Sequence, residues 1–227
     1  MSQSLTGKEK ARLVVLISGG GSNLQSFIDA CENKFLNAEI AAVISNKANV
    51  KGLERAANAN IPNIVIDHRG FDSREEFDEE LATLIESFNP HLVILAGFMR
   101  ILTADFVARF LGKLIYIHPS LLPAYPGLHT HQRAIDSGDN EAGATVHFVT
   151  PELDGGPSVL QARVPIKSND SAEILASRVL TYEHQIYPQV AQWFCQGRLI
   201  MKEGIAILDG ESLGENGIIF GTTSEQK

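Results

Sequence analysis

Three short runs of apolar residues, at 12–18, 91–96 and 114–117, constrain what this 227-residue chain can fold into. Each run has the length of a β-strand and is apolar at successive positions, so we expect each strand to be covered on both faces. Segments with helical periodicity alternate with strands along the chain. This order of elements predicts an α/β fold with a doubly wound, mainly parallel sheet and helices on both faces, similar to a Rossmann fold.

The other elements follow from periodicity and from residues that begin or end helices. Ser73 and Glu76 form a capping-box pattern, which predicts the start of a helix. Pro165 follows an apolar run and indicates an edge strand, because proline donates no hydrogen bond to a sheet. We expect one domain over 1–227, with loose tails at about 1–10 and 217–227. Further strands are expected at 39–45, 63–67, 143–149 and 158–164, a hairpin at 198–208, and helices at 50–60, 73–88, 103–110, 130–137 and 171–194.

Composition excludes several classes of protein. The formal net charge of −8 argues against a general binder of nucleic acid or of membrane surfaces. No apolar run approaches the roughly 20 residues of a membrane span, and the polar N-terminus does not resemble a signal peptide. Cys31 and Cys195 match no metal-binding spacing, which is typical of reduced thiols in the cytoplasm. We therefore expect a cytoplasmic protein whose partners are small molecules rather than nucleic acid or a membrane. The sequence does not decide between a monomer and a homodimer.

The run Gly19-Gly20-Gly21-Ser22-Asn23 stands between the first strand and a helix. In that arrangement backbone N–H groups and a helix N-terminus point at an anion, and glycine allows the backbone to approach the ligand. Ser22 or Asn23 could cap the helix or donate to a phosphate. The alternative is a tight turn that needs glycine and binds nothing. The run matches neither GxGxxG nor a lysine-bearing P-loop, so a dinucleotide or ATP is not favoured.

A stiff loop after the strand at 114–117 contains the strongest catalytic candidate. His118 stands at the strand end, and three prolines and a glycine then forbid regular structure up to residue 129. Loops at the carboxyl ends of strands carry the chemistry in many α/β proteins. The alternative is a histidine that only caps the strand end by hydrogen bonding.

Asp154 lies in a second loop braced by glycine and proline, at 151–157, and is the acid expected beside His118. A carboxylate next to an imidazole raises the pKa of the imidazole and orients it, which suits a general acid near neutral pH. His129 and His131 could indicate a metal, but no third ligand stands at a fitting spacing. We expect no metal and assign both to helix capping and loop packing. No GxSxG motif or active-site cysteine signature indicates covalent catalysis.

Adjacent residues in the sequence suggest the roles of two further positions. Arg100 comes after an apolar strand, where a guanidinium suits a bidentate carboxylate partner, although a solvent-exposed arginine is the alternative. The Leu122–Pro123 bond lies in a proline-dense loop, which is a reasonable place for a cis peptide.

Taken together, these motifs resemble the phosphoribosylglycinamide formyltransferase family, folate-dependent enzymes of purine synthesis. The resemblance spans nearly the whole chain, and it implies transfer of formyl from 10-formyltetrahydrofolate to the amine of glycinamide ribonucleotide. The products would be formylglycinamide ribonucleotide and tetrahydrofolate. The matching motifs are GGGSN at 19–23, SNK at 45–47, LAGFMRIL at 95–102, HPSLLP at 118–123, YPGLHTH at 125–131, LDGGP at 153–157, EH at 183–184 and IYP at 186–188.

The resemblance also implies a role for each site residue. His118 would act as the acid, and Asp154 would keep it protonated. Residues 11–110 would form a nucleotide-binding half and residues 111–210 a catalytic and folate-binding half. The ribonucleotide would be held by Gly21, Ser22 and Asn23 at its phosphate and by Glu183 at its ribose. The folate would be lined by Arg74, Met99, Arg100, Ile101, Leu102 and Tyr116, with Asp154 nearby.

Tyr116 departs from the family pattern, which carries asparagine two residues before the histidine. The amide of that asparagine would donate to the oxyanion of the tetrahedral intermediate, and it also faces the folate. A tyrosine hydroxyl can donate too, but it sits farther out on a rigid ring. We therefore expect either reduced turnover or a local rearrangement around Tyr116.

Alternative functions differ in the features they would require. A formyltetrahydrofolate deformylase, which is a hydrolase, usually carries an N-terminal regulatory domain, and only about ten residues precede the first expected strand. Methionyl-tRNA formyltransferase would need a C-terminal tRNA-binding domain and a basic face. A chain with Tyr116 could also bind nucleotide or folate without turnover. The imperfect glycine motif disfavours a dinucleotide-dependent oxidoreductase.

Overall fold

The computed structural model describes residues 10–221, so most of the tails expected at 1–10 and 217–227 lies outside it. Most elements lie where periodicity predicts them, within a few residues at each end. The strands are β1 (Ala11–Ile17), β2 (Ala38–Ser45), β3 (Asn63–Val65), β4 (Leu92–Leu95), β5 (Leu114–His118), β6 (Glu141–Phe148), β7 (Ser158–Pro165), β8 (Leu199–Lys202), β9 (Ile205–Leu208), β10 (Glu211–Ser212) and β11 (Ile218–Ile219). The helices are α1 (Ser22–Glu32), α2 (Lys51–Asn58), α3 (Arg74–Ser87), α4 (Ala104–Arg109), α5 (Thr130–Asp136) and α6 (Ala172–Cys195), with a 3₁₀ turn η1 (His68–Gly70).

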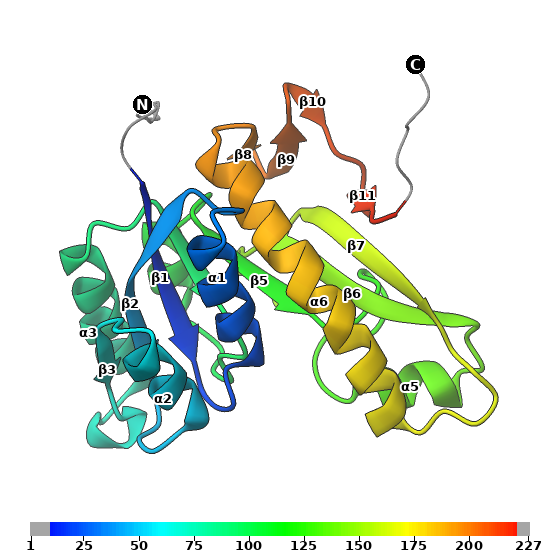
Figure 1. Ribbon diagram of the computed structural model, residues 1–227, viewed down its shortest axis with the longest axis horizontal. Helices are drawn as coiled ribbons and strands as arrows, with labels where there is room; N and C mark the ends of the chain where they lie inside the picture. The colour runs from blue at the N-terminus through cyan, green and yellow to red at the C-terminus, as the bar shows by residue number, and fades with distance from the viewer. Residues whose placement is uncertain (1–9, 222–227) are drawn as a thin grey trace.

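An eight-stranded mixed sheet forms the centre of the molecule (Figure 1). Its strands are ordered β11-β7-β6-β5-β4-β1-β2-β3. Neighbours from β5 to β3 are parallel, whereas β6 runs antiparallel to both β5 and β7. The small sheet β10-β9-β8 contains the expected hairpin and follows α6. This is the mostly parallel α/β architecture that the sequence predicts.

The sheet separates two hydrophobic cores, which explains why β1 is apolar at successive positions. Leu13 and Val15 pack into the core beneath α1 and α6, while Val14 and Leu16 pack into the core beneath α3 and α4. All four side chains are fully buried. Figure 1 shows α1 and α6 crossing the same face of the sheet. Among the helices within residues 10–221, none is long and apolar enough to cross a membrane.

Tyr187 ties the long helix α6 to two central strands. Its hydroxyl lies 3.1 Å from the carbonyl oxygen of Leu95 at the end of β4 and 3.0 Å from that of Ile115 in β5. The ring is fully buried and meets the ring of Phe27 from α1 edge-on, with centroids 5.0 Å apart. The position of α6 is therefore set by a polar contact inside an apolar core.

The last described residues differ from the loose tail expected at 217–227. Ile218–Ile219 forms β11 and pairs in parallel with the middle of β7. The N–H of Phe220 also donates to the carbonyl of Gln161 at 2.7 Å. Consequently β7 is the second strand of the sheet at Leu160 and Gln161, whereas its end at Pro165 pairs only with β6 among residues 10–221, as the proline indicated.

The N-terminus of α3 has the cap that the sequence predicts, whereas the N-terminus of α1 does not. Ser73 Oγ accepts the N–H of Glu76 at 3.1 Å, as predicted, although the carboxylate of Glu76 accepts from Asp72 rather than from Ser73. At α1 the cap position is Gly21, with a φ of 67°, and no side chain caps the helix. The expectation that Ser22 or Asn23 caps α1 is therefore wrong.

We expect Tyr187→Phe to lower the free energy of unfolding by about 1–3 kcal/mol, because two buried carbonyls lose a donor. The measurement is the urea midpoint, followed by circular dichroism. Tyr182→Phe is the matched control, since the Tyr182 hydroxyl makes no hydrogen bond to the described residues. Equal midpoints for the two variants would show that the Tyr187 hydroxyl does not stabilise the fold.

Candidate active site

The carboxyl ends of β1, β4 and β5 meet at one edge of the sheet, because these strands are parallel neighbours. The glycine loop leaves β1, the segment 97–102 leaves β4, and His118 is the last residue of β5. The prediction that these three segments gather at one sheet edge is confirmed.

The glycine loop presents free backbone donors at the start of α1. Its carbonyl at Gly21 accepts the first helical bond, from the N–H of Gln25 at 2.9 Å. The N–H groups of Gly20, Gly21, Ser22 and Asn23 donate to no atom of the described chain. Unpaired donors at a helix N-terminus are the arrangement that binds anions.

Asn23 connects the glycine loop to α6. Its Nδ2 donates to Oε2 of Glu183 at 2.8 Å, and both residues are only 8% exposed. Burial raises the pKa of Glu183, and the hydrogen bond from Asn23 opposes that rise. The residues predicted to hold the phosphate and the ribose are therefore in direct contact, and Asn23 Oδ1 is buried without a protein partner among residues 10–221.

His118 is 2% exposed and has protein atoms beside both ring nitrogens. Nε2 lies 2.9 Å from the carbonyl oxygen of Tyr125, and a carbonyl can only accept, so Nε2 carries a proton. Nδ1 faces Oδ2 of Asp154 at 3.5 Å, which is longer than a normal hydrogen bond. The structure thus brings together the predicted histidine and acid from two loops.

Asp154 also holds the proline loop. It lies between β6 and β7 with a φ of 51°, and its Oδ2 accepts the N–H of Gly127 at 2.8 Å. One buried carboxylate oxygen therefore faces His118 and anchors the loop that covers it. This double contact fixes the ring and the loop relative to each other.

Polar side chains from β6 and β7 anchor the start of the same loop. Thr145 Oγ1 donates to the carbonyl of Ser120 at 2.7 Å and accepts the N–H of Leu122 at 3.1 Å. Gln161 Nε2 donates to the carbonyl of Leu122 at 2.6 Å. The Leu122–Pro123 bond, whose isomer the sequence does not fix, is cis.

Tyr116 shares a face of β5 with His118 and lies opposite His147 of β6. Its ring centroid is 5.7 Å from that of His147 and 6.0 Å from that of His118. Burial raises the pKa of the Tyr116 hydroxyl, and the negative charges of Asp154 and Glu183 add to the rise. The hydroxyl therefore lies within electrostatic reach of both candidate carboxylates.

The segment 99–102 is held from two sides. Ser18 Oγ accepts the N–H of Met99 at 2.8 Å, and Asp78 Oδ2 accepts the N–H of Thr103 at 2.6 Å. Burial raises the pKa of Asp78, although the Thr103 hydrogen bond and the charges of Arg100 and Arg74 oppose it. These contacts fix the backbone of the segment that follows β4.

The side chains predicted to line the folate differ in exposure. Met99 is 65% and Ile101 61% exposed, whereas Leu102 is partly buried. Arg100 lies over the ring of Phe77 at 4.7 Å, so it is not the solvent-exposed arginine of the alternative interpretation. Arg74, at the start of α3, is exposed and lies near the same buried Asp78. Exposed apolar side chains beside two arginines suit a ligand with an aromatic ring and carboxylates.

The two other loop histidines do not form the expected cap. His129 occupies the cap position of α5 with a φ of 57°, but its side chain makes no cap hydrogen bond. Burial, and then the nearby His118, lowers the pKa of His131. In the described part of the chain no three His, Cys, Asp or Glu side chains come together as a metal site.

Sequence reasoning missed several residues that support the site. Thr145, His147 and Gln161 occur at inward positions of apolar strands, and a buried polar side chain in such a run is the signal that could have marked them. Arg55 and Asp78 carry no comparable signal, because their contacts join segments far apart in the sequence.

The fold and the histidine–aspartate pair define an α/β protein with a glycine loop, whose backbone donors are unpaired in the described part of the chain, and a candidate acid at the same edge of the sheet. A family model described as Formyl transferase matches residues 11–191. The chain is 54% identical over 205 residues to phosphoribosylglycinamide formyltransferase of Escherichia coli K12, covering 90% of this chain and 97% of that protein. It is 51% identical over 206 residues to the Haemophilus influenzae protein of the same name, covering 91% and 97%.

A solved structure of phosphoribosylglycinamide formyltransferase from Coxiella burnetii has a TM-score of 0.90 and 48% identity, covering 93% of this chain and 100% of that one. The chain therefore belongs to the phosphoribosylglycinamide formyltransferase family. This confirms the family and the fold predicted from the sequence. None of the comparisons supports the expectation that Tyr116 impairs turnover.

We expect stability to fall as the pH drops from about 6.5 to about 4, in part because of His147. Its Nδ1 donates to the carbonyl of Phe148 at 2.8 Å, while Nε2 is buried without a partner among residues 10–221, and burial lowers the pKa of His147 to about 4. Over this pH range the unfolded chain binds a proton that the folded chain excludes, so stability rises with pH by on the order of 3 kcal/mol in total.

The measurement is the free energy of unfolding of wild type and His147→Asn at several values between pH 4 and pH 7. The asparagine keeps a donor near the Nδ1 position but does not titrate, so its pH slope should be shallower. His129→Asn removes an exposed histidine and serves as the control. The same slope in His147→Asn and wild type would contradict the assignment.

Proposed function

We propose that this chain transfers the formyl group of 10-formyltetrahydrofolate to the amine of glycinamide ribonucleotide, a step of purine synthesis. The observation that carries the proposal is that a glycine loop with backbone donors unpaired within residues 10–221 and a buried His118–Asp154 pair lie at the same edge of the sheet, at the ends of β1 and β5. Membership of the phosphoribosylglycinamide formyltransferase family supports the choice of both substrates. The cytoplasmic location, the lack of a metal and the monomer or homodimer state stay predictions.

The ribonucleotide binds between the glycine loop and α6 in this proposal. Gly21, Ser22 and Asn23 hold the phosphate through backbone N–H groups, and Glu183 accepts from a ribose hydroxyl. Support comes from the unpaired donors of the loop and from the 2.8 Å contact between Asn23 and Glu183. Residues 11–110 then act mainly as the nucleotide-binding half, and residues 111–210 as the catalytic and folate-binding half.

The folate binds along the segment 99–102 in this proposal. Apolar Met99, Ile101 and Leu102 pack against its ring system, and Tyr116 lines the same space. The carboxylates of the folate pair with Arg74 or Arg100, which lie near each other around Asp78. The support is the exposure of Met99 and Ile101, since large apolar side chains on a surface commonly mark a ligand site.

The chemistry is an acyl transfer without a covalent enzyme intermediate. The amine nitrogen of the ribonucleotide bonds to the formyl carbon and produces a tetrahedral oxyanion. His118 donates to that oxygen, and the carboxylate of Asp154 stabilises the protonated ring. The bond between carbon and the folate nitrogen then breaks, and the proton lost by the amine reaches that nitrogen directly or through water.

Tyr116 supplies a second donor to the oxyanion in this proposal, at the position where the family carries asparagine. Its hydroxyl is within electrostatic reach of both Asp154 and Glu183. A donor aimed at a developing oxyanion contributes a few kcal/mol to the transition state. The ring stays in contact with His147, so the backbone of β5 need not move to accommodate it.

The test of the proposed function is an absorbance assay of folate product with glycinamide ribonucleotide, run on wild type and His118→Asn. We expect turnover in wild type and a fall in kcat of about 10²–10⁴-fold in the variant, because the acid is removed. Both KM values should change little. Folded wild-type protein without turnover would refute the proposal, and formate release without ribonucleotide would instead indicate a hydrolase.

Tyr116→Phe tests the second donor, because it removes the hydroxyl and keeps the ring against His147. We expect kcat to fall about 10²–10³-fold with normal folding. Tyr116→Asn, which restores an amide donor at this position, should retain turnover. If Tyr116→Phe works as fast as wild type in the same assay, the hydroxyl is not the donor.

A further inference from the structure

Each peptide group of the glycine loop is fixed through its carbonyl oxygen. Gly19 O accepts the N–H of Gly52 at 3.0 Å, and Gly20 O accepts Nε of Arg55 at 2.9 Å, both from α2. Gly21 O accepts the N–H of Gln25. In a planar trans peptide the C=O and the following N–H point in opposite directions. Fixing the Gly19 and Gly20 carbonyls therefore points the N–H groups of Gly20 and Gly21 away from α2.

Close packing between two glycines keeps α2 beside the loop. A Cβ added to Gly21 would lie 2.7 Å from the Cα of Gly52, and one added to Gly52 would lie 2.5 Å from Cδ1 of Ile17. A larger residue at either position would push α2 away from the loop. The glycine at 52 is thus explained by its contact with the loop rather than by a turn of its own.

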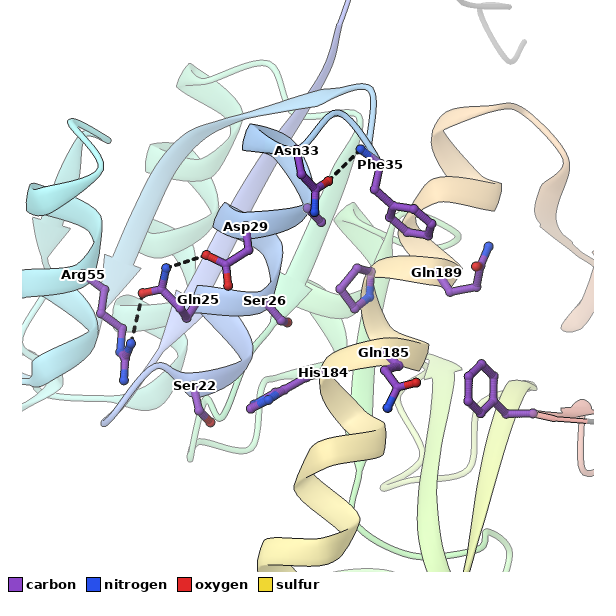
Figure 2. Close-up of a pocket in the computed structure, with 13 residues that line it drawn as sticks. Ser22, Gln25, Ser26, Asp29, Asn33, Phe35, Arg55, His184, Gln185 and Gln189 are labelled. Carbon is purple, nitrogen blue, oxygen red and sulfur yellow. Dashed lines mark hydrogen bonds between the residues drawn. The ribbon is translucent and has the colours of Figure 1, made fainter.

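Arg55 is itself held in place by α1. Its Nη1 donates to Oε1 of Gln25 at 3.0 Å, and Nε2 of Gln25 donates to Oδ1 of Asp29 at 2.8 Å (Figure 2). A guanidinium with two committed donors presents a fixed edge to the Gly20 carbonyl, which a flexible ammonium could not do equally well.

The same arginine borders a cleft of about 550 Å³ between α1 and α6, which Ser22 and His184 also line. Figure 2 shows His184 reaching from α6 toward Ser22, with Arg55 on the other side of the cleft. Burial, and then the positive charge of Arg55, lowers the pKa of His184. The positive charge of Arg55 therefore acts on His184 across the cleft, beside the start of α1.

We propose that Arg55 is a positioning residue for ribonucleotide binding. It holds the Gly20 carbonyl away from the phosphate and so aims the N–H of Gly21 at it. Without Arg55 the peptide plane between Gly20 and Gly21 can flip, so that its C=O and N–H exchange directions. Glycine on both sides allows this, because no side chain restricts the rotation. A turned peptide would present a carbonyl oxygen to the phosphate, and the two would repel. The inference rests on the proposed function, which assigns the phosphate to this loop.

The experiment compares wild type with Arg55→Met and Arg55→Lys. We expect Arg55→Met to weaken binding of ribose 5-phosphate, measured by calorimetry, by about tenfold or more, because a charge-assisted hydrogen bond is lost. The KM for glycinamide ribonucleotide should rise by a similar factor, while kcat and the KM for the folate stay within about twofold. The affinity of Arg55→Lys should be intermediate, because lysine keeps the positive charge but lacks the planar guanidinium that donates to two acceptors at once.

Arg163→Met is the matched control, since Arg163 is half-exposed in an ion pair with Glu141 on β6, away from the loop. Unchanged ribose 5-phosphate affinity in Arg55→Met would overturn the proposal. So would a rise in both KM values together with a lower urea midpoint, because that indicates a general structural role. Weaker sugar-phosphate binding in Arg55→Met with no turnover in wild type would support Arg55 and refute only the proposed function.

Discussion

Tyr187 joins the longest helix to the two strands that end at the candidate site, and the distances within the site depend on that contact. One helical turn before it, Glu183 lies on the same side of α6 and meets Asn23 at the start of α1. The helix therefore spans from the glycine loop to the end of β5. Because the face of α6 that carries Glu183 and Tyr187 is buried, the distance between the loop and His118 is set by a rigid element rather than by flexible loops. Such rigidity is what an acyl transfer between two bound substrates needs.

His118 has a second constraint, since both of its ring nitrogens face protein groups. Nε2 donates to the Tyr125 carbonyl, and Nδ1 faces Asp154, which also binds Gly127. Asp154 faces Nδ1 and helps to fix the orientation of the ring. The Tyr125 carbonyl occupies the side of the ring from which a proton can leave. In the proposed reaction it is therefore the group that the substrate replaces when it approaches to hydrogen-bond distance.

Much of the fold and part of the site could be predicted from local patterns. Apolar runs marked β1, β4 and β5, and their order implied that His118 and the glycine loop lie at one sheet edge. Asp154 was found because glycine and proline brace its loop. The strand β11 could not be found, since two isoleucines form a strand only when β7 is beside them. Asp78 and Arg55 were missed for the same reason: each acts on a backbone group that is distant in sequence, and no periodicity records such a contact.

Tyr116 shows why a departure from a family pattern has to be interpreted with its neighbours. Residue 116 is paired with residue 147 across the β5–β6 ladder, so its side chain both faces the site and packs on His147. Asparagine there would return the amide but leave space beside a buried, neutral imidazole. Phenylalanine keeps the packing and removes only the hydroxyl. The two substitutions therefore separate the chemical role of this residue from its structural one, which neither could do alone.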